Sequence, residues 1–239
     1  MDEVPKLLAY NRYFGRELPV YYVCDSFVVY DDLWTPLARE MKKNIKRENQ
    51  NTALVEGPTG SGKSSKALIL CSKLDPKFNL GDDYIYSTRD MKKKLKKKEK
   101  ANPVSLFDEG SVSLNSLNTM QKDNKKLTIL MDAWRVLGKT NIICIPNSGD
   151  LNKRVLANHI DYLIKCPAPD DPMVPGEDAR RFCTIYTHKH RTWGKDYWQP
   201  IGRTKCDKVE KKLWAEYMKI KRERLEGLID DYTEEDDDE

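Results

Sequence analysis

The sequence predicts an α/β fold in which a largely parallel central sheet is flanked by helices, with a β-hairpin and a helix added towards the C-terminus. Three observations predict it. Short apolar runs typical of buried strands lie at residues 52–55, 141–145 and 161–165. Segments with apolar residues at helical spacing lie at 63–73 and 124–137. A glycine-rich loop separates the first run from the first helical segment, and strands that alternate with helices favour parallel pairing.

The composition is that of a folded protein with a heavily charged surface. The chain has 239 residues, of which 39% are hydrophobic and 33% charged, which suits one α/β core with additions. No apolar run approaches the roughly 20 residues that cross a bilayer, and the first residues do not resemble a signal peptide. The six cysteines form no C-x-x-C pair. We therefore expect reduced thiols and a cytoplasmic location.

Residues 57–64 match the phosphate-binding spacing G-x-x-x-x-G-K-[ST] without a mismatch. Glycines let the backbone curl so that successive N–H groups point at a phosphate, and the helix that comes next adds its positive end. Lys63 is expected to reach the β- and γ-phosphates, and Ser64 to hold Mg²⁺. A glycine-rich surface turn is the alternative, but the order of strand, loop and helix favours a P-loop that binds ATP and Mg²⁺. The predicted nucleotide contacts are Gly57, Pro58, Thr59, Gly60, Ser61, Gly62, Lys63, Ser64 and Ser65.

Two acidic residues, Asp108 and Glu109, follow a mostly apolar run at 103–107. This pattern is typical of the second half of an ATPase site, in which one carboxylate holds the metal and its neighbour activates the attacking water. We predict that Asp108 holds Mg²⁺ with Ser64 and that Glu109 is the general base. A structural acid pair at a strand end is the alternative.

Asn147 follows the next apolar run and is a candidate sensor of the γ-phosphate, although it could instead cap a turn. We expect its strand to lie beside the strand that ends at Asp108. Because parallel strands place their carboxyl ends at one edge of a sheet, the P-loop, Asp108, Glu109 and Asn147 are expected to converge there.

The charge is distributed unevenly. Eight of the 38 acidic residues lie at 230–239, so the rest of the chain carries 42 basic against 30 acidic residues. A basic body with an acidic tail suggests a polyanion partner, or only a solubilising disordered end. Lysine-rich stretches could contact phosphates or form solvated helix faces. The candidate nucleic-acid contacts are Lys92, Lys93, Lys94, Lys96, Lys97, Lys98, Lys122, Lys125, Lys126, Lys189, Arg191 and Lys195.

Residues 181–198 alternate in the manner of a β-hairpin that turns near Trp193. Cations and aromatics crowd its tip, which suits either a nucleic-acid backbone or a contact between subunits. His188 and His190 share one strand face, but two ligands without a third argue against a metal site.

The domain organisation is inferred from these segments. Residues 1–50 form an N-terminal extension with two short strands, at 20–23 and 27–30, and a helix for which Thr35 and Pro36 supply a start. Residues 51–168 form the P-loop core. Residues 169–227 form the hairpin and a final amphipathic helix, and residues 228–239 form an acidic tail that we expect to be disordered.

The order of these motifs resembles the FtsK/HerA-like class of P-loop ATPases. The resemblance covers residues 53–167 and is carried by the P-loop, by Phe107-Asp108-Glu109, by Arg135 and by Asn147. The chain is most similar to the zonula-occludens-toxin-like and viral genome-packaging ATPases. It differs from the filamentous-phage members, which carry a transmembrane segment, and it has no evident nuclease motif.

The resemblance implies a homo-oligomeric ring, a hexamer or pentamer, that pulls double-stranded DNA through its centre. It implies that Arg135 reaches the site of a neighbouring subunit, although an ordinary salt bridge within the chain is the alternative. The expected function is therefore an ATP-hydrolysing DNA translocase for genome packaging or DNA transfer, with a portal or coat component as a further partner. A nucleotide-gated assembly scaffold is the main alternative, and a small-molecule kinase is a third.

Overall fold

The computed structural model describes residues 7–46, 51–85, 90, 104–108, 132, 139–151, 153–191 and 195–236. The chain divides into two compact units, Met1–Asp207 and Lys208–Glu239. The predicted helix at 124–137 lies outside the described residues except for Asp132, whose backbone is helical. None of the helices described is long and apolar enough to cross a membrane.

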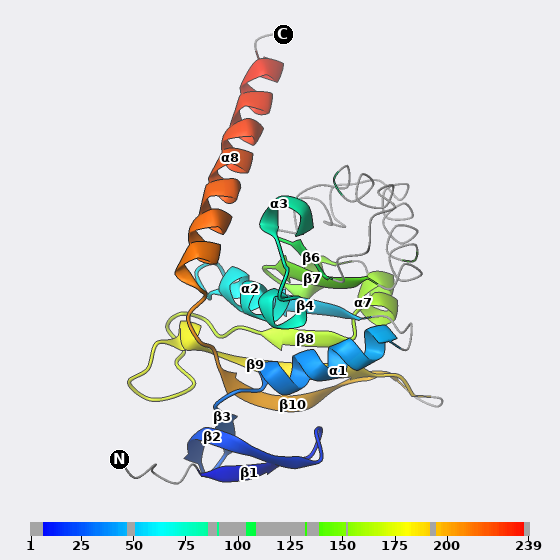
Figure 1. The fold of residues 1–239 in the computed structure, drawn as a ribbon, viewed down its shortest axis with the longest axis vertical. Helices are drawn as coiled ribbons and strands as arrows, with labels where there is room; N and C mark the ends of the chain where they lie inside the picture. Colours follow the sequence, from blue (N-terminus) through cyan, green and yellow to red (C-terminus); the bar gives the residue numbers. More distant parts are fainter. Residues whose placement is uncertain are drawn as a thin grey trace. The chain divides into compact units, whose positions relative to one another are not determined.

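The first unit is built on one sheet of ten strands in the order β1-β2-β3-β10-β9-β8-β4-β7-β6-β5 (Figure 1). The strands are β1 (Leu8–Asn11), β2 (Arg16–Cys24), β3 (Phe27–Tyr30), β4 (Thr52–Glu56), β5 (Tyr84–Ile85), β6 (Val104–Phe107), β7 (Thr140–Ile145), β8 (Tyr162–Lys165), β9 (Phe182–Lys189) and β10 (Tyr197–Lys205).

The centre of the sheet is parallel, as predicted. β4 pairs in parallel with β7 on one side and β8 on the other, and β6 pairs in parallel with β7 and β5. β7 therefore lies between the P-loop strand and the strand that ends before Asp108. All five strands are almost completely buried, which is why their sequences are mostly apolar and do not alternate between apolar and polar residues.

One row of side chains crosses the sheet and forms its core on one face. Phe107, Ile143, Leu54 and Leu163 are register partners from strand to strand, and each is at most 5% exposed. Val155 of α7 (Lys153–His159) packs on this row, so α7 covers that face. The sequence analysis did not identify α7, because its seven residues are too few to show a helical period.

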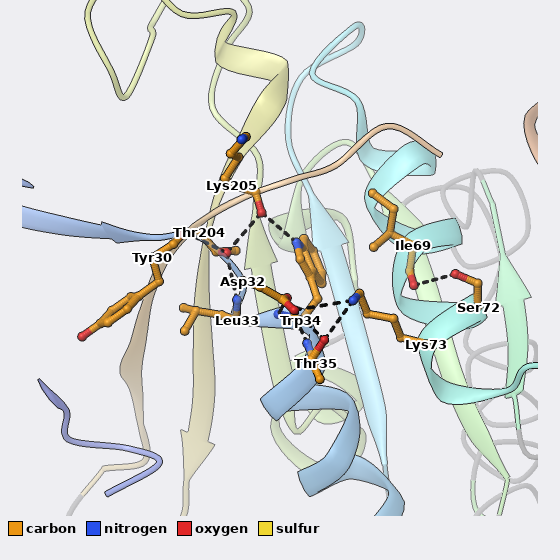
Figure 2. A network of polar contacts seen from close by, with 10 residues as sticks. All are labelled: Tyr30, Asp32, Leu33, Trp34, Thr35, Ile69, Ser72, Lys73, Thr204 and Lys205. Atoms are coloured by element: carbon orange, nitrogen blue, oxygen red, sulfur yellow. Dashed lines mark hydrogen bonds and ion pairs between the residues drawn. The ribbon is translucent and has the colours of Figure 1, made fainter. Parts of the chain in front are cut away.

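Helices α1 (Trp34–Lys46) and α2 (Lys63–Leu74) pack against each other. Asp32, just before α1, accepts hydrogen bonds from the backbone N–H groups of Trp34 and Thr35. Lys73 of α2 lies 3.6 Å from Asp32 and donates to Thr35 Oγ1, as Figure 2 shows. The prediction of Thr35 as the cap and Pro36 as the first helical residue is thus wrong by two residues: the helix begins at Trp34, and Asp32 supplies the cap.

The predicted C-terminal hairpin is confirmed, and it belongs to the sheet itself. β10 pairs antiparallel with β9, β9 pairs antiparallel with β8, and β10 pairs in parallel with β3. The two predicted N-terminal strands are also present, and β3 extends the same sheet. Short helical segments connect these elements: α3 (Leu80–Asp83), η1 (Ser148–Asp150) and η2 (Ala179–Arg181).

The second unit is the helix α8 (Lys211–Asp236), whose Trp214 and Tyr217 rings lie 5.2 Å apart. The helix continues through Gly227 to Asp236, which differs from the disordered tail that we expected. Residues 225–232 include Leu225, Leu228, Ile229 and Tyr232 between the charges. The leucines favour helix more than a run of aspartates does, and they allow the helix to propagate.

Candidate nucleotide site

The loop between β4 and α2 has the backbone that the glycine spacing predicts. Gly57, Gly60 and Gly62 have φ values of 152°, 80° and 78°, a region that side-chain-bearing residues rarely adopt. At Gly57 a Cβ atom would lie 2.8 Å from the Cβ and the carbonyl oxygen of Cys166 and from Ser61 Oγ. Glycine is therefore required there both by conformation and by space.

Lys63 opens α2 and folds back over its own loop. Its ammonium group donates to the carbonyl oxygens of Gly57 at 2.7 Å and Pro58 at 2.9 Å. These acceptors are neutral, so a phosphate would be a stronger partner for the ammonium group. The position suits the predicted role of Lys63 in holding phosphate oxygens.

Ser64 and Asp108 are brought together from the two halves of the predicted site. The Ser64 hydroxyl donates to Asp108 Oδ1 at 3.2 Å, and Asp108 is 2% exposed. A hydroxyl and a carboxylate are oxygen donors, which Mg²⁺ prefers, and phosphate oxygens bound at the adjacent glycine loop would complete its coordination. The donor set therefore fits Mg²⁺. Burial, with the Asp108 charge as a further cause, raises the pKa of the neighbouring Cys144 thiol well above its ordinary value.

The end of β7 lies against the P-loop. Pro146 accepts a hydrogen bond from the Gly57 N–H at 3.2 Å. Asn147 comes next and caps η1, because its Oδ1 accepts from the Gly149 N–H at 2.9 Å. In this structure the side-chain oxygen of Asn147 therefore caps a turn, which was the alternative to its role as a sensor.

Glu56 is a residue that the sequence analysis missed. It ends β4, and its Oε2 accepts from the Ser148 N–H at 2.9 Å while its Oε1 lies 3.2 Å from Lys165 Nζ. The carboxylate therefore ties the ends of β7 and β8 to the strand that enters the P-loop. An acid at the end of an otherwise apolar strand was the feature that could have indicated it.

Lys66 is a second missed residue, and it is completely buried. Its ammonium group donates to Ser61 O in the P-loop and to Arg180 O in η2, each at 2.9 Å. Because η2 leads directly into β9, this side chain joins the phosphate-binding loop to the hairpin. A lysine among the apolar residues of α2 was the only sequence feature that pointed to it.

Several predicted residues lie outside the described residues. They are Glu109, Arg135, Lys92, Lys93, Lys94, Lys96, Lys97, Lys98, Lys122, Lys125 and Lys126. Their proposed roles stay predictions.

The predicted cations of the hairpin lie at the other edge of the sheet. Thr187 of β9 pairs with the first residue of β8, and β9 ends two residues later, so this end of β9 lies at the amino end of β8. The P-loop instead follows the last residue of β4, which runs parallel to β8. Lys189 lies over the Tyr13 ring at 5.6 Å, and Arg191 lies over the Tyr197 ring at 4.4 Å. Lys195 is exposed.

A cavity of about 520 Å³ opens beside Lys189. Its cationic side chains come from three elements, which is why no single stretch of sequence indicated it. They are Arg16, Arg39, Lys43 and Lys189, together with the aromatic rings of Tyr13 and Phe14. One acid, Glu40, also lines the cavity and lies 3.6 Å from Lys43. We call this surface the basic cavity.

Comparisons with known proteins find similarity among solved structures alone. No protein-family model matches the chain, and no curated protein is similar to it. The N-terminal domain of zonular occludens toxin from Neisseria meningitidis matches with a TM-score of 0.40 and 12% identity, over 70% of this chain and 97% of that domain.

Two further structures match over shorter regions. A replication initiator DnaA bound to AMPPCP and single-stranded DNA gives a TM-score of 0.34 and 15% identity, over 54% of this chain. A single-residue variant of RuvB from Thermotoga maritima gives 0.37 and 18%, over 56%. The matched region spans 44% of the DnaA chain and 43% of the RuvB chain, less than half of each.

These likenesses are distant, so the assignment rests on the geometry of the chain itself. The glycine loop lies between β4 and α2, the lysine and serine of the motif open the helix, and an acid from a strand two places away contacts that serine. This combination of strand order and loop is the fold of a P-loop NTPase.

Proposed function

We propose that the protein is an ATP-hydrolysing motor that translocates double-stranded DNA, for genome packaging or DNA transfer by a virus or mobile element. The observation that carries the ATPase part is the contact between Ser64 and Asp108 at the mouth of the P-loop. The FtsK/HerA-like resemblance supports the DNA part, and with it a ring of five or six subunits that docks on a portal or coat component.

The proposed chemistry uses the residues at the carboxyl ends of the parallel strands. Lys63 holds the γ-phosphate, and Glu109 takes a proton from the attacking water. Ser64 and Asp108 would hold Mg²⁺, which supplies charge neutralisation at the phosphates. Arg135 of a neighbouring subunit would stabilise the charge that develops on the transferred group. Asn147 would sense the γ-phosphate through its amide nitrogen, because its oxygen holds the Gly149 N–H.

The DNA contacts are proposed at the opposite edge of the sheet. The basic cavity combines four cations with two aromatic rings, and Arg191 and Lys195 extend its charge along the hairpin. Cations neutralise phosphates and release counterions, which gives affinity without regard to sequence, as a translocase requires. The lysine-rich residues 92–98 and 122–126 lie outside the described residues and stay candidate DNA contacts.

Coupling between the two edges is proposed to run through Lys66. Its ammonium group holds Ser61 O in the P-loop and Arg180 O at the start of the hairpin. A rearrangement of the loop on hydrolysis would therefore act on the segment that leads into β9, whose far end carries Lys189.

The test is the rate of ATP hydrolysis with and without double-stranded DNA. We expect stimulation by DNA that is lost in Glu109→Gln. A triple variant, Lys189→Gln with Arg191→Gln and Lys195→Gln, should keep basal hydrolysis and lose most of the stimulation. It should also lower the slope of log affinity against log salt by about three, one for each lost phosphate contact.

The matched control for this charge loss is Lys211→Gln with Lys212→Gln and Lys219→Gln in α8, three exposed cations outside the hairpin. It should keep the stimulation. Hydrolysis that is indifferent to DNA in the unmodified protein would reject the motor proposal.

An assembly scaffold controlled by nucleotide is the second candidate. The observation that favours it is β1, which ends the sheet and carries the exposed side chains of Leu8 and Tyr10, 51% and 62% accessible, next to Leu7 at 61%. An apolar edge strand is a ready template for strand addition by another chain. Oligomerisation that depends on ATP, measured by light scattering, without stimulation of hydrolysis by DNA would favour this function over the motor.

A further inference from the structure

A group of three metal-ligating side chains lies at the hairpin, far from the nucleotide site. His188 lies near the end of β9, His190 comes directly after that strand, and Asp196 directly precedes β10. Within the part of the chain that the structure describes, this is the one such group found. Our expectation from the sequence was two histidines without a third ligand. Asp196 is that third ligand, brought to them by the pairing of the two strands.

Strand geometry places the three side chains together. His188 and His190 are two residues apart, so they project from the same face of the hairpin, and Lys189 projects from the other face. Trp198, two residues after Asp196, is the register partner of His188. Asp196 Oδ2 lies 2.9 Å from His190 Nδ1 and 3.9 Å from His188 Nε2. The three ligand atoms all lie within 4.8 Å of one another.

A surface ion pair alone does not explain the burial of His188. Its side chain is only 6% exposed and stacks on the Trp198 ring with centroids 4.7 Å apart. Among the described residues its Nδ1 has no hydrogen-bond partner, and its Nε2 lies too far from Asp196 for a hydrogen bond. A cation bound at Nε2 would give that nitrogen a partner, although it would leave Nδ1 unpaired.

The carboxylate is already oriented for this role. Asp196 Oδ1 accepts a hydrogen bond from the Arg191 N–H at 3.0 Å, which turns Oδ2 towards both imidazoles. Hydrogen bonds of this kind, made by the groups behind a ligand, commonly fix the orientation of metal ligands. Arg191 is itself held by stacking over Tyr197 at 4.4 Å.

The spacing suits a small transition-metal ion. Zinc binds imidazole nitrogen and carboxylate oxygen at about 2.0–2.2 Å, which separates two ligands of a tetrahedral site by about 3.3 Å. The distances of 2.9 and 3.9 Å lie on either side of that value. Imidazole with carboxylate selects zinc and its neighbours rather than Mg²⁺ or Ca²⁺.

We propose that His188, His190 and Asp196 bind one Zn²⁺ ion that joins β9 to β10 at the base of the hairpin tip. His190 and Asp196 are 63% and 36% exposed, so the fourth position faces solvent and takes water or a phosphate oxygen. The bound ion fixes the position of Arg191 and Lys195 on either side of the turn. This site is separate from the proposed Mg²⁺ ligands, and its existence does not depend on ATP hydrolysis.

The test uses the full chain, stripped of metal with a chelator and then titrated with Zn²⁺ by calorimetry. We expect one Zn²⁺ per chain, a rise in Tm on binding, and a visible absorption spectrum with Co²⁺ that indicates tetrahedral nitrogen and oxygen ligands. His188→Gln and Asp196→Asn should each weaken Zn²⁺ binding at least about tenfold. Asp170→Asn, which changes an exposed carboxylate elsewhere, should leave it unchanged.

Two further measurements keep the result unambiguous. Ser64→Ala with Asp108→Asn should still bind one Zn²⁺, which separates this site from the nucleotide site. Circular dichroism of each variant should match that of the unmodified protein, so that weaker binding reflects lost ligands and not unfolding. Absence of stoichiometric Zn²⁺ binding, or equal binding in His188→Gln, would overturn the proposal and leave His190 and Asp196 as a simple ion pair.

Discussion

The ammonium group of Lys66 lies 2.9 Å from the carbonyl oxygen of Arg180, 114 residues away along the chain. The same group holds Ser61 O, and the side chain is completely buried. A buried lysine is retained only where its hydrogen bonds compensate for the loss of hydration. Two carbonyl groups, one in the P-loop and one before β9, provide that compensation here.

Lys66→Met should therefore destabilise the protein by about 2–4 kcal/mol, because two carbonyl groups lose their donor while a methionine fills the space. Nucleotide affinity should fall with it, since Ser61 is part of the phosphate-binding loop. Calorimetric unfolding and binding of a fluorescent ATP analogue measure the two effects. Lys63→Ala is the comparison: it should lose nucleotide affinity with little change in Tm, and an equal loss of Tm in both variants would contradict this division of roles.

Gly57→Ala should cost about 3 kcal/mol or more, because the new Cβ would meet three atoms at 2.8 Å in a backbone conformation that alanine resists. Gly176→Ala is the matched control. Its φ is 76° and no atom lies within 4 Å of the added Cβ, so the cost should be about 1 kcal/mol of backbone strain alone. Urea unfolding of both variants measures the difference, and equal costs would show that Cys166 yields to the new side chain.

Asp108→Asn should remove the advantage that Mg²⁺ gives to ATP binding. In the unmodified protein ATP should bind at least about tenfold more tightly with Mg²⁺ than with a chelator, and in the variant the two affinities should converge. Asp170→Asn controls for the loss of one negative charge. A preserved Mg²⁺ effect in Asp108→Asn would mean that the metal ligand from β6 is a different residue.

The lowered pKa of Glu177 predicts how the stability of the protein depends on pH. Hydrogen bonds from Tyr21 and Arg181 hold the pKa of this carboxyl below its ordinary value of 4.5. Its contribution to stability is thus fully present above pH 4.5 and is lost as the pH falls through the lower pKa of the folded state. Glu177→Gln should reduce stability at neutral pH and flatten its acid-side decline. A decline as steep as that of the unmodified protein would assign the acid sensitivity to other carboxyls.

Local patterns were sufficient to predict the contact between Ser64 and Asp108. The glycine spacing, the apolar strand before Asp108 and the rule for carboxyl ends of parallel strands together predicted that Ser64 and Asp108 would meet. The prediction that the strand of Asn147 lies beside that of Asp108 is also confirmed. Each of these inferences uses residues close in sequence, or a property shared by all parallel sheets.

Contacts set by long-range pairing could not be predicted in this way. Asp196 joins the two histidines only through the register of β9 and β10. The basic cavity gathers cations from β2, α1 and β9. Lys66 lies among apolar residues of α2, but the sequence does not show that Ser61 O and Arg180 O accept its hydrogen bonds. In each case the sequence does not show which residues become neighbours in the fold, and those neighbours give each residue its role.

The placement of β9 has a mechanical consequence. The strand has eight residues, about 26 Å at roughly 3.3 Å per residue, and its neighbours β8 and β10 hold it on both sides by hydrogen bonds. This pairing restrains β9 from bending by itself. Lys66 holds the backbone just before one end of the strand, and Lys189 lies at the other end. The register shift between Pro200 and Gly202 lies in β10, so β9 is the regular strand of the pair. A shift of the phosphate-binding loop would therefore act on one end of a strand whose other end carries Lys189 of the basic cavity.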